Sequence, residues 1–226
     1  MNARTVIMFA SLAALSSVAQ GTFQNLNFEA AMIVPIPGQP YTVQFAPAFP
    51  GWSASFAGFP TSRAITNAFA LSTPGICLFA PGSMFGSPIE GYTAALQATY
   101  SSNPDFTASA SLFQVGTLPT DARAIQLKFS GTSDSMTIFT VSFAGQNISL
   151  TPVGAGANYT LLQGDISAYA GQNGELRLTA LPSANHPSTL GYFDSIVFSS
   201  VPEPATWALL GLGGALLWGA ARRRMK

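Results

Sequence analysis

The sequence predicts an all-β protein, built as an antiparallel β-sandwich, and three observations favour it. Apolar and polar residues alternate over short runs, which is typical of half-buried strands. Between residues 20 and 200 no stretch keeps helical spacing for more than about ten residues. The 21 glycines and 16 prolines, together with Asn and Ser, interrupt the runs often enough to supply the turns of two antiparallel sheets.

The expected strands extend over the whole region 20–200. The clearest unit is a hairpin, in which the runs 137–143 and 148–150 are joined by the glycine-containing loop 144–147. Residues 159–174 are expected to form a strand, a short helical turn around 165–169 and a loop. The other runs predicted as strands are 23–31, 41–45, 75–80, 92–100, 106–113, 124–130, 175–181 and 192–199.

The first 19 residues are expected to form a signal peptide. Arg4 supplies a positive charge, residues 6–15 are apolar, and Ser17-Val18-Ala19 provides small residues before Gln20. This order is typical of a secretory signal peptide that is cleaved after Ala19. The alternative is a buried N-terminal helix. A permanent membrane-spanning helix is not expected, because an apolar core of about ten residues is too short to span a bilayer. The exported domain is therefore expected at 20–200.

Residues 205–221 carry no charge and are expected to form a transmembrane helix. At 1.5 Å per residue they are about as long as the shortest helices that cross a hydrocarbon core. Trp207 and Trp218 stand near the two ends, and the basic end 222–226 follows, with Arg222, Arg223, Arg224 and Lys226. Clustered cations stay on the cytoplasmic side, so the domain 20–200 is expected outside. The alternative, a core helix of a soluble domain, would seldom end in such a cluster.

The order of Val201, Pro202, Glu203 and Pro204, then an apolar span, then an arginine cluster resembles the PEP-CTERM sorting signal of Gram-negative bacteria. The resemblance covers 201–226, with the motif at 202–204. It implies that the chain is held transiently in the inner membrane, with its domain in the periplasm. It also implies recognition by an exosortase and delivery to the cell surface or an extracellular matrix. Residues 201–204 would then be a processing site and not catalytic residues.

Charge limits the kinds of partner. The domain 20–200 is mildly acidic, because its cations are Arg63, Arg123, Lys128 and Arg177, whereas its carboxylates are Glu29, Glu90, Asp105, Asp121, Asp134, Asp165, Glu175 and Asp194. No basic stripe is present, so nucleic-acid binding is not expected. The single cysteine, Cys77, lies in the apolar run Ile76-Cys77-Leu78-Phe79 and is expected to be a buried, inert thiol.

The chain has few side chains for catalysis. Its single histidine, His186, lies in the loop-like run Asn185-His186-Pro187, and no Gly-x-Ser-x-Gly nucleophile elbow accompanies it. A pair of carboxylates could hydrolyse glycosides, and the sequence neither places nor excludes such a pair, although carboxylates are scarce. The sequence therefore predicts a non-catalytic protein with no catalytic residues, with a secreted glycosidase or esterase as an alternative.

Three short segments resemble the galactose-binding-like jelly roll of carbohydrate-binding and adhesive modules. They are Asn25-Leu26-Asn27-Phe28-Glu29, Asp194-Ser195-Ile196 and the run 170–177. The resemblance implies that the first segment pairs with the second. It also implies a structural calcium ion between them, with Glu29 and Asp194 as carboxylate ligands. Alternatively, both side chains only accept hydrogen bonds from turn amides. No other cofactor is expected.

Sugar binding would need an exposed aromatic face. Trp52, in a loop-like setting, and the weaker candidates Tyr41 and Tyr92 are the predicted ligand-binding residues, with burial of Trp52 in the core as the alternative. The leading hypothesis is an envelope-exported sandwich that binds exopolysaccharide or other glycans, or that forms part of the matrix. The main alternative is an adhesive, self-assembling protein that binds other proteins.

Overall fold

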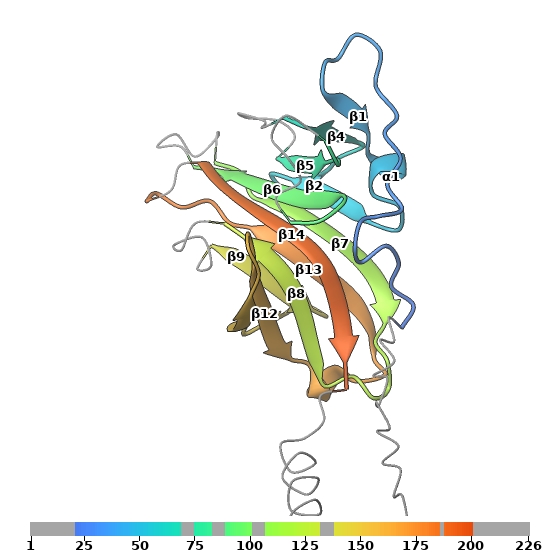
Figure 1. Cartoon of the computed structure of the whole chain (residues 1–226), viewed down its shortest axis with the longest axis vertical. Helices are drawn as coiled ribbons and strands as arrows, with labels where there is room; N and C mark the ends of the chain where they lie inside the picture. Colours follow the sequence, from blue (N-terminus) through green and yellow to red (C-terminus); the bar gives the residue numbers. More distant parts are fainter. Residues whose placement is uncertain are drawn as a thin grey trace, which may run out of the picture.

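The computed structural model describes residues 21–68, 75–82, 89–100, 107–131, 138–185 and 188–200 (Figure 1). The predicted signal peptide, His186, the sorting residues 201–204, the apolar span 205–221 and the arginine cluster 222–224 lie outside the described residues. Within the described ranges, no helix is long and apolar enough to span a membrane.

One sheet has eight strands, and only one pair of neighbours, β4 and β5, runs parallel. The strands follow the order β1-β4-β5-β6-β14-β8-β12-β11. Their bounds are β1 Thr42–Gln44, β4 Arg63–Thr66, β5 Ile76–Phe79, β6 Thr93–Thr99, β8 Ala124–Ser130, β11 Thr151–Ala155, β12 Thr160–Asp165 and β14 Ser188–Ser199.

The second sheet has six strands in the order β10-β9-β13-β7-β2-β3. Their bounds are β2 Ser53–Phe56, β3 Phe59–Pro60, β7 Ala110–Thr117, β9 Phe139–Phe143, β10 Gln146–Ile148 and β13 Asn173–Ala180. The described residues also include a four-residue helix, α1 Phe45–Ala48, and a 3-10 turn, η3 Ser167–Tyr169.

The two sheets confirm the predicted β-sandwich. From β6 onward the chain crosses repeatedly between the sheets, with hairpins at β9-β10 and β11-β12, so that β6-β14-β8-β12 lies in one sheet and β10-β9-β13-β7 in the other. This alternating order is that of a jelly roll. The elements β1 to β5 extend the sandwich at one end. In Figure 1, β1, β4 and α1 lie at the upper end, whereas β14 ends at the lower end, near the start of β8.

The core follows from the strand periodicity. On β13, Leu176 and Leu178 are buried between the sheets, whereas Glu175 and Arg177 face outward. A glycine makes room where an aromatic ring packs against a strand. A Cβ atom on Gly191 of β14 would lie 2.4 Å from the Phe139 ring, so this position needs glycine for the ring to pack against the strand.

Two strand predictions were wrong in part. Residues 23–31 form turns and not a strand, because Asn25 and Phe28 adopt left-handed φ angles of 48° and 59°. Leu26 and Phe28 are nevertheless fully buried, which is why the pattern looked like an alternating strand. In the predicted hairpin, the connection is shorter than expected: only Ala144 and Gly145 lie between β9 and β10, both with positive φ.

Candidate functional site

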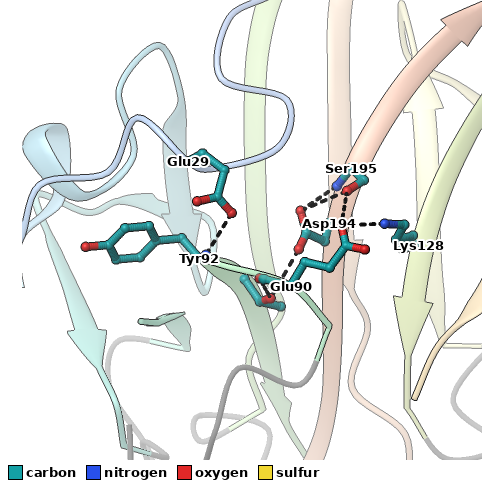
Figure 2. A network of polar contacts seen from close by, with 7 residues as sticks. Glu29, Glu90, Tyr92, Lys128, Asp194 and Ser195 are labelled. Atoms are coloured by element: carbon teal, nitrogen blue, oxygen red, sulfur yellow. Dashed lines mark hydrogen bonds and ion pairs between the residues drawn. The ribbon is translucent and has the colours of Figure 1, made fainter. Parts of the chain in front are cut away.

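Three carboxylates, Glu29, Glu90 and Asp194, approach one another beside β14, and we call them the acidic cluster (Figure 2). Asp194 is its buried member, only 1% exposed. Its Oδ1 atom accepts the backbone N–H of Ser195 at 2.6 Å, and its Oδ2 atom accepts the Thr93 hydroxyl at 3.3 Å. Both oxygens of this carboxylate therefore face protein donors, although the Thr93 hydroxyl shares its single proton with the Glu90 carbonyl at 2.9 Å.

A β-bulge in β14 creates this arrangement. The register between β14 and β8 shifts between Asp194 and Val197, and Ser195 has a left-handed φ of 50°. The shift frees the backbone N–H of Ile196, which donates to the Leu26 carbonyl at 3.0 Å. The segment 25–29 thus does lie against 194–196, as the resemblance implied, but through this single backbone bond and not as a paired strand.

Glu29 is held on the other side of the cluster by a turn. Its Oε1 atom accepts the backbone N–H of Tyr92 at 2.9 Å. The neighbouring Gly91 has a φ of +31°, and a Cβ atom there would lie 1.8 Å from the same oxygen. Glycine is therefore required at position 91 for Glu29 to bind the turn. This contact matches the alternative in which a turn amide satisfies Glu29.

Glu90 binds the counter-ion of the site, Lys128. It forms an ion pair with Lys128 of β8, whose side chain is largely shielded from solvent, whereas that of Glu90 is exposed. The Lys128 ammonium also lies 5.0 Å from the centre of the Tyr159 ring. Among the described residues, the cation that faces the cluster is thus paired with Glu90 and not with the buried Asp194.

The pKa of Asp194 is raised to about 7, chiefly because burial disfavours the charged form. The nearby carboxylates Glu29 and Glu90 raise this pKa further. Hydrogen bonds from Ser195 and Thr93 lower it and offset part of the effect. Asp194 therefore takes up a proton close to neutral pH.

The described part of the chain does not by itself build a metal site. Within it, no three Asp, Glu, His or Cys side chains are arranged to hold a metal ion. Calcium needs six to eight oxygens, and both carboxylate oxygens of Asp194 accept protein hydrogen bonds. The predicted calcium ligands Glu29 and Asp194 do lie in one cluster, but a calcium shell there would need additional oxygens.

The predicted aromatic ligand-binding residues are scattered. Trp52 is a core residue, 6% exposed, with its Nε1 donating to the Asn25 carbonyl at 3.1 Å and its ring stacked on Phe28. It therefore offers no free face to a sugar, and its burial in the core is the alternative that the sequence left open for Trp52. Tyr41 is 63% exposed. The Tyr92 ring is partly buried and points away from Asp194 (Figure 2).

A second candidate site lies on either side of Arg63, at the end of the sandwich formed by β1, β3 and β4. Two open hollows, of about 600 Å³ and about 560 Å³, meet at Thr61 and Arg63. Phe59 borders one of them and is 74% exposed. Arg63 Nη1 donates to Gln39 Oε1 at 3.1 Å. We call this the tip surface, made of Gln39, Thr42, Gln44, Phe59, Thr61 and Arg63.

The tip surface was not predicted from the sequence. Phe59 lies in a two-residue strand after the turn at Ala57 and Gly58, and such a short run leaves no readable alternation. One signal was available. Arg63 is the single charged residue between positions 30 and 89, in a stretch otherwise without Asp, Glu, Lys or Arg. An isolated cation in such a segment marks a position worth examining.

Comparison with known proteins gives one firm result. No curated protein matches the sequence. A solved structure of TmCBM61 in complex with beta-1,4-galactotriose has 12% identity and a TM-score of 0.41, over 80% of this chain and 98% of that chain. Residues 200–224 match the PEP-CTERM protein-sorting motif. This match confirms the resemblance of the C-terminal region, and the chain is an exported protein that carries a PEP-CTERM sorting tail.

Proposed function

We propose that this exported chain is a non-catalytic β-sandwich that binds carbohydrate through its tip surface. The observation that carries the proposal is the Phe59 ring, 74% exposed, at the edge of an open hollow next to Arg63. Phe59 is the most exposed large hydrophobic residue in the described part of the chain. An aromatic ring at the edge of a hollow offers a face on which a sugar ring can stack.

The polar groups around Phe59 suit hydroxyl-rich ligands. The hollows are lined by the amides Gln39 and Gln44, the hydroxyls of Thr42 and Thr61, and the guanidinium of Arg63. Amides and hydroxyls both donate and accept hydrogen bonds, as sugar hydroxyls do. A ring face combined with a few fixed polar groups is the general composition of a saccharide site.

The sorting motif supports a location outside the inner membrane for this binding. A chain that carries it is expected to be recognised by an exosortase and held by the span 205–221 until it is released. The proposed destination is the cell surface or the exopolysaccharide matrix, where a glycan-binding sandwich would meet its ligand. The partners are thus an exosortase and a polysaccharide.

The competing functions have less support. Self-assembly through sheet edges would need an open edge strand. Of the four edge strands in the described sheets, β1, β3 and β10 have only two or three residues, and β11 contains Pro152 and an irregular register between Pro152 and Gly154. Short edges, proline and irregular register all hinder pairing with another chain. For a glycosidase, two carboxylates should face a cleft, yet neither tip hollow is lined by a carboxylate.

A glycan array with the full-length protein in mild detergent tests the proposal. We expect binding to at least one polysaccharide, and we expect Phe59→Ala to weaken it about tenfold, because losing one stacking contact costs about 1.4 kcal/mol. Val153→Ala is the matched control, since Val153 is also an exposed apolar residue but lies on β11. Absence of binding to every glycan, or equal losses in both variants, would reject the proposal.

Calcium at Glu29 and Asp194 remains a separate proposal. It is supported by the buried Asp194 carboxylate, which Glu29 and Glu90 both disfavour in its charged form. A divalent cation would reverse this effect and stabilise the ionised carboxylates. The role of such an ion would be structural, since it would tie the turn at 25–29 to β14.

A further inference from the structure

The tip surface is unusual in its charge. Arg63 is the single Asp, Glu, Lys or Arg residue among positions 30–89, which include β1 to β5. The remaining residues around the two hollows are apolar or uncharged, namely Ile36, Gln39, Thr42, Gln44, Phe45, Ala46, Pro47, Phe56, Ala57, Phe59, Pro60, Thr61 and Ser62. One positive charge therefore stands in the middle of a neutral surface.

The guanidinium of Arg63 has most of its donors to spare. It carries five N–H groups, and the described contact uses one of them, from Nη1 to Gln39 Oε1 at 3.1 Å. The ion pairs found within the described residues join Lys128 to Glu90 and Arg177 to Glu175, so neither involves Arg63. The bond to Gln39 orients the guanidinium without neutralising it.

Arg177 provides a comparison, because its guanidinium is bound by partners within the protein. Its Nε donates to Glu175 Oε1 at 2.7 Å, and its Nη2 donates to Glu175 Oε2 at 3.2 Å. Its guanidinium also lies 4.0 Å from the centre of the Phe113 ring. Arg177 thus has both a carboxylate and an aromatic partner. Arg63 shares a hollow with the aromatic residue Phe59, and among the described residues it has no carboxylate partner.

We propose that the ligand supplies this missing carboxylate, so that the tip surface binds polysaccharides that contain uronic acids. The inference rests on the proposed carbohydrate-binding function and names the class of glycan. A guanidinium fork matches a carboxylate with two parallel hydrogen bonds, which gives geometric selectivity as well as charge. The neighbouring Phe59 ring then stacks on the sugar whose carboxylate Arg63 holds.

The direct test uses polymers that differ only in charge. Polygalacturonate and alginate are compared with their carboxyl-reduced forms, with full-length protein in mild detergent at low salt. We expect the wild type to bind at least one polyuronate about tenfold or more tighter than its reduced form, and we expect added salt to weaken this preference. Arg63→Gln should bind both forms equally, and Arg63→Lys should keep only part of the preference.

Arg123→Gln provides the matched control, because it removes an exposed cation next to β8 and leaves the tip surface intact. It should bind as the wild type does. Two further ligands separate the sources of charge: sulfated dextran presents anions without carboxylates, and poly-L-glutamate presents carboxylates without sugars. Both should bind more weakly than the polyuronate.

Equal binding to the acidic and reduced polymers would overturn this inference but would leave carbohydrate binding in place. Equally strong binding to sulfated dextran or to poly-L-glutamate would also overturn it, since the site would then recognise charge alone or a protein. If no polymer in the set and no glycan on the array bound, both the inference and the proposed function would fail.

Discussion

The acidic cluster and the tip surface differ in the burial and the hydrogen-bond partners of their charged groups. In the acidic cluster, the Asp194 carboxylate is buried, and both of its oxygens accept protein donors. At the tip surface, Arg63 is exposed and bonded only to a neutral amide in the described contacts. The first arrangement is closed on itself and holds the N-terminal turns against β14. The second leaves hydrogen-bonding capacity for a ligand.

A group of charged residues is therefore not sufficient evidence for a binding site. Glu29 and Asp194 of the acidic cluster were predicted as calcium ligands from a resemblance, yet their hydrogen bonds explain them as part of the structure. The tip surface contains one charge and one ring, and its significance appears only when the hollows are seen. The following predictions separate structural residues from ligand-binding ones.

The largest effect is expected at Trp52, which is a core residue and not a ligand-binding one. Trp52→Ala should lower the free energy of unfolding by about 3–5 kcal/mol, because it empties a large volume in the core. Trp52→Phe should cost less, since it keeps most of the volume and loses the bond to the Asn25 carbonyl. Chemical denaturation measures both. Phe59→Ala serves as the exposed aromatic control, and a cost for it as large as that for Trp52→Ala would contradict the assignment.

Calcium tests whether the acidic cluster is more than a closed network. If Glu29 and Asp194 bind the ion, calcium at a hundred times its dissociation constant should stabilise the protein by about 2.7 kcal/mol. Thermal unfolding with calcium or with a chelator measures this, and Asp194→Asn should abolish the response. An unchanged melting temperature at millimolar calcium would remove the calcium proposal and leave the tip surface unaffected.

Gly91 tests the turn that holds Glu29. Gly91→Ala should destabilise the protein by about 2 kcal/mol, because the new methyl displaces the Glu29 carboxylate from the Tyr92 amide and the backbone has positive φ. Gly145→Ala is the matched control, since Gly145 also has positive φ but has open space around its Cβ position. Denaturant unfolding compares them. Equal costs would show that the contact with Glu29 adds nothing.

Asp194 should give the protein a particular pH dependence. Its pKa is near 7 in the folded protein and 3.8 in the reference state, so between these values the folded state holds a proton that the unfolded chain has lost. Stability from this group is complete at low pH, falls as pH rises toward 7 by up to about 1.4 kcal/mol per unit, and is constant above.

The comparison of wild type with Asp194→Asn isolates this contribution, because Glu29, Glu90 and Lys128 face the site in both proteins. Urea unfolding at pH 5, 6, 7 and 8 should show the wild type losing its advantage over the variant as pH rises to 7. Parallel stability curves across this range would show that Asp194 is ionised throughout.

Much of the fold could be predicted from the sequence because strand periodicity survives burial. The run 124–130 became β8 without change, and the helical turn predicted around 165–169 is η3. The turns at 23–31 could not be predicted, because left-handed residues at Asn25 and Phe28 keep alternate side chains buried without a strand. In this segment the alternating sequence pattern does not correspond to an extended backbone.

The candidate sites show the same limit. Glu29 and Asp194 were predicted to lie together from a family resemblance. Their proximity depends on a bulge at Ser195, which the neighbouring residues do not predict. Phe59 and Arg63 belong to strands of two and four residues, and their hollows depend on β1, which comes from a separate run. Such surfaces arise from tertiary packing.

Hydrogen–deuterium exchange of the full-length protein, with and without the polysaccharide that binds it best, tests most directly whether the tip surface is the ligand site. Binding should slow exchange in residues 39–44 and 56–63 and leave residues 190–196 of β14 unchanged. Protection at 190–196 with none at the tip would place the ligand at the acidic cluster and contradict the division between the two regions.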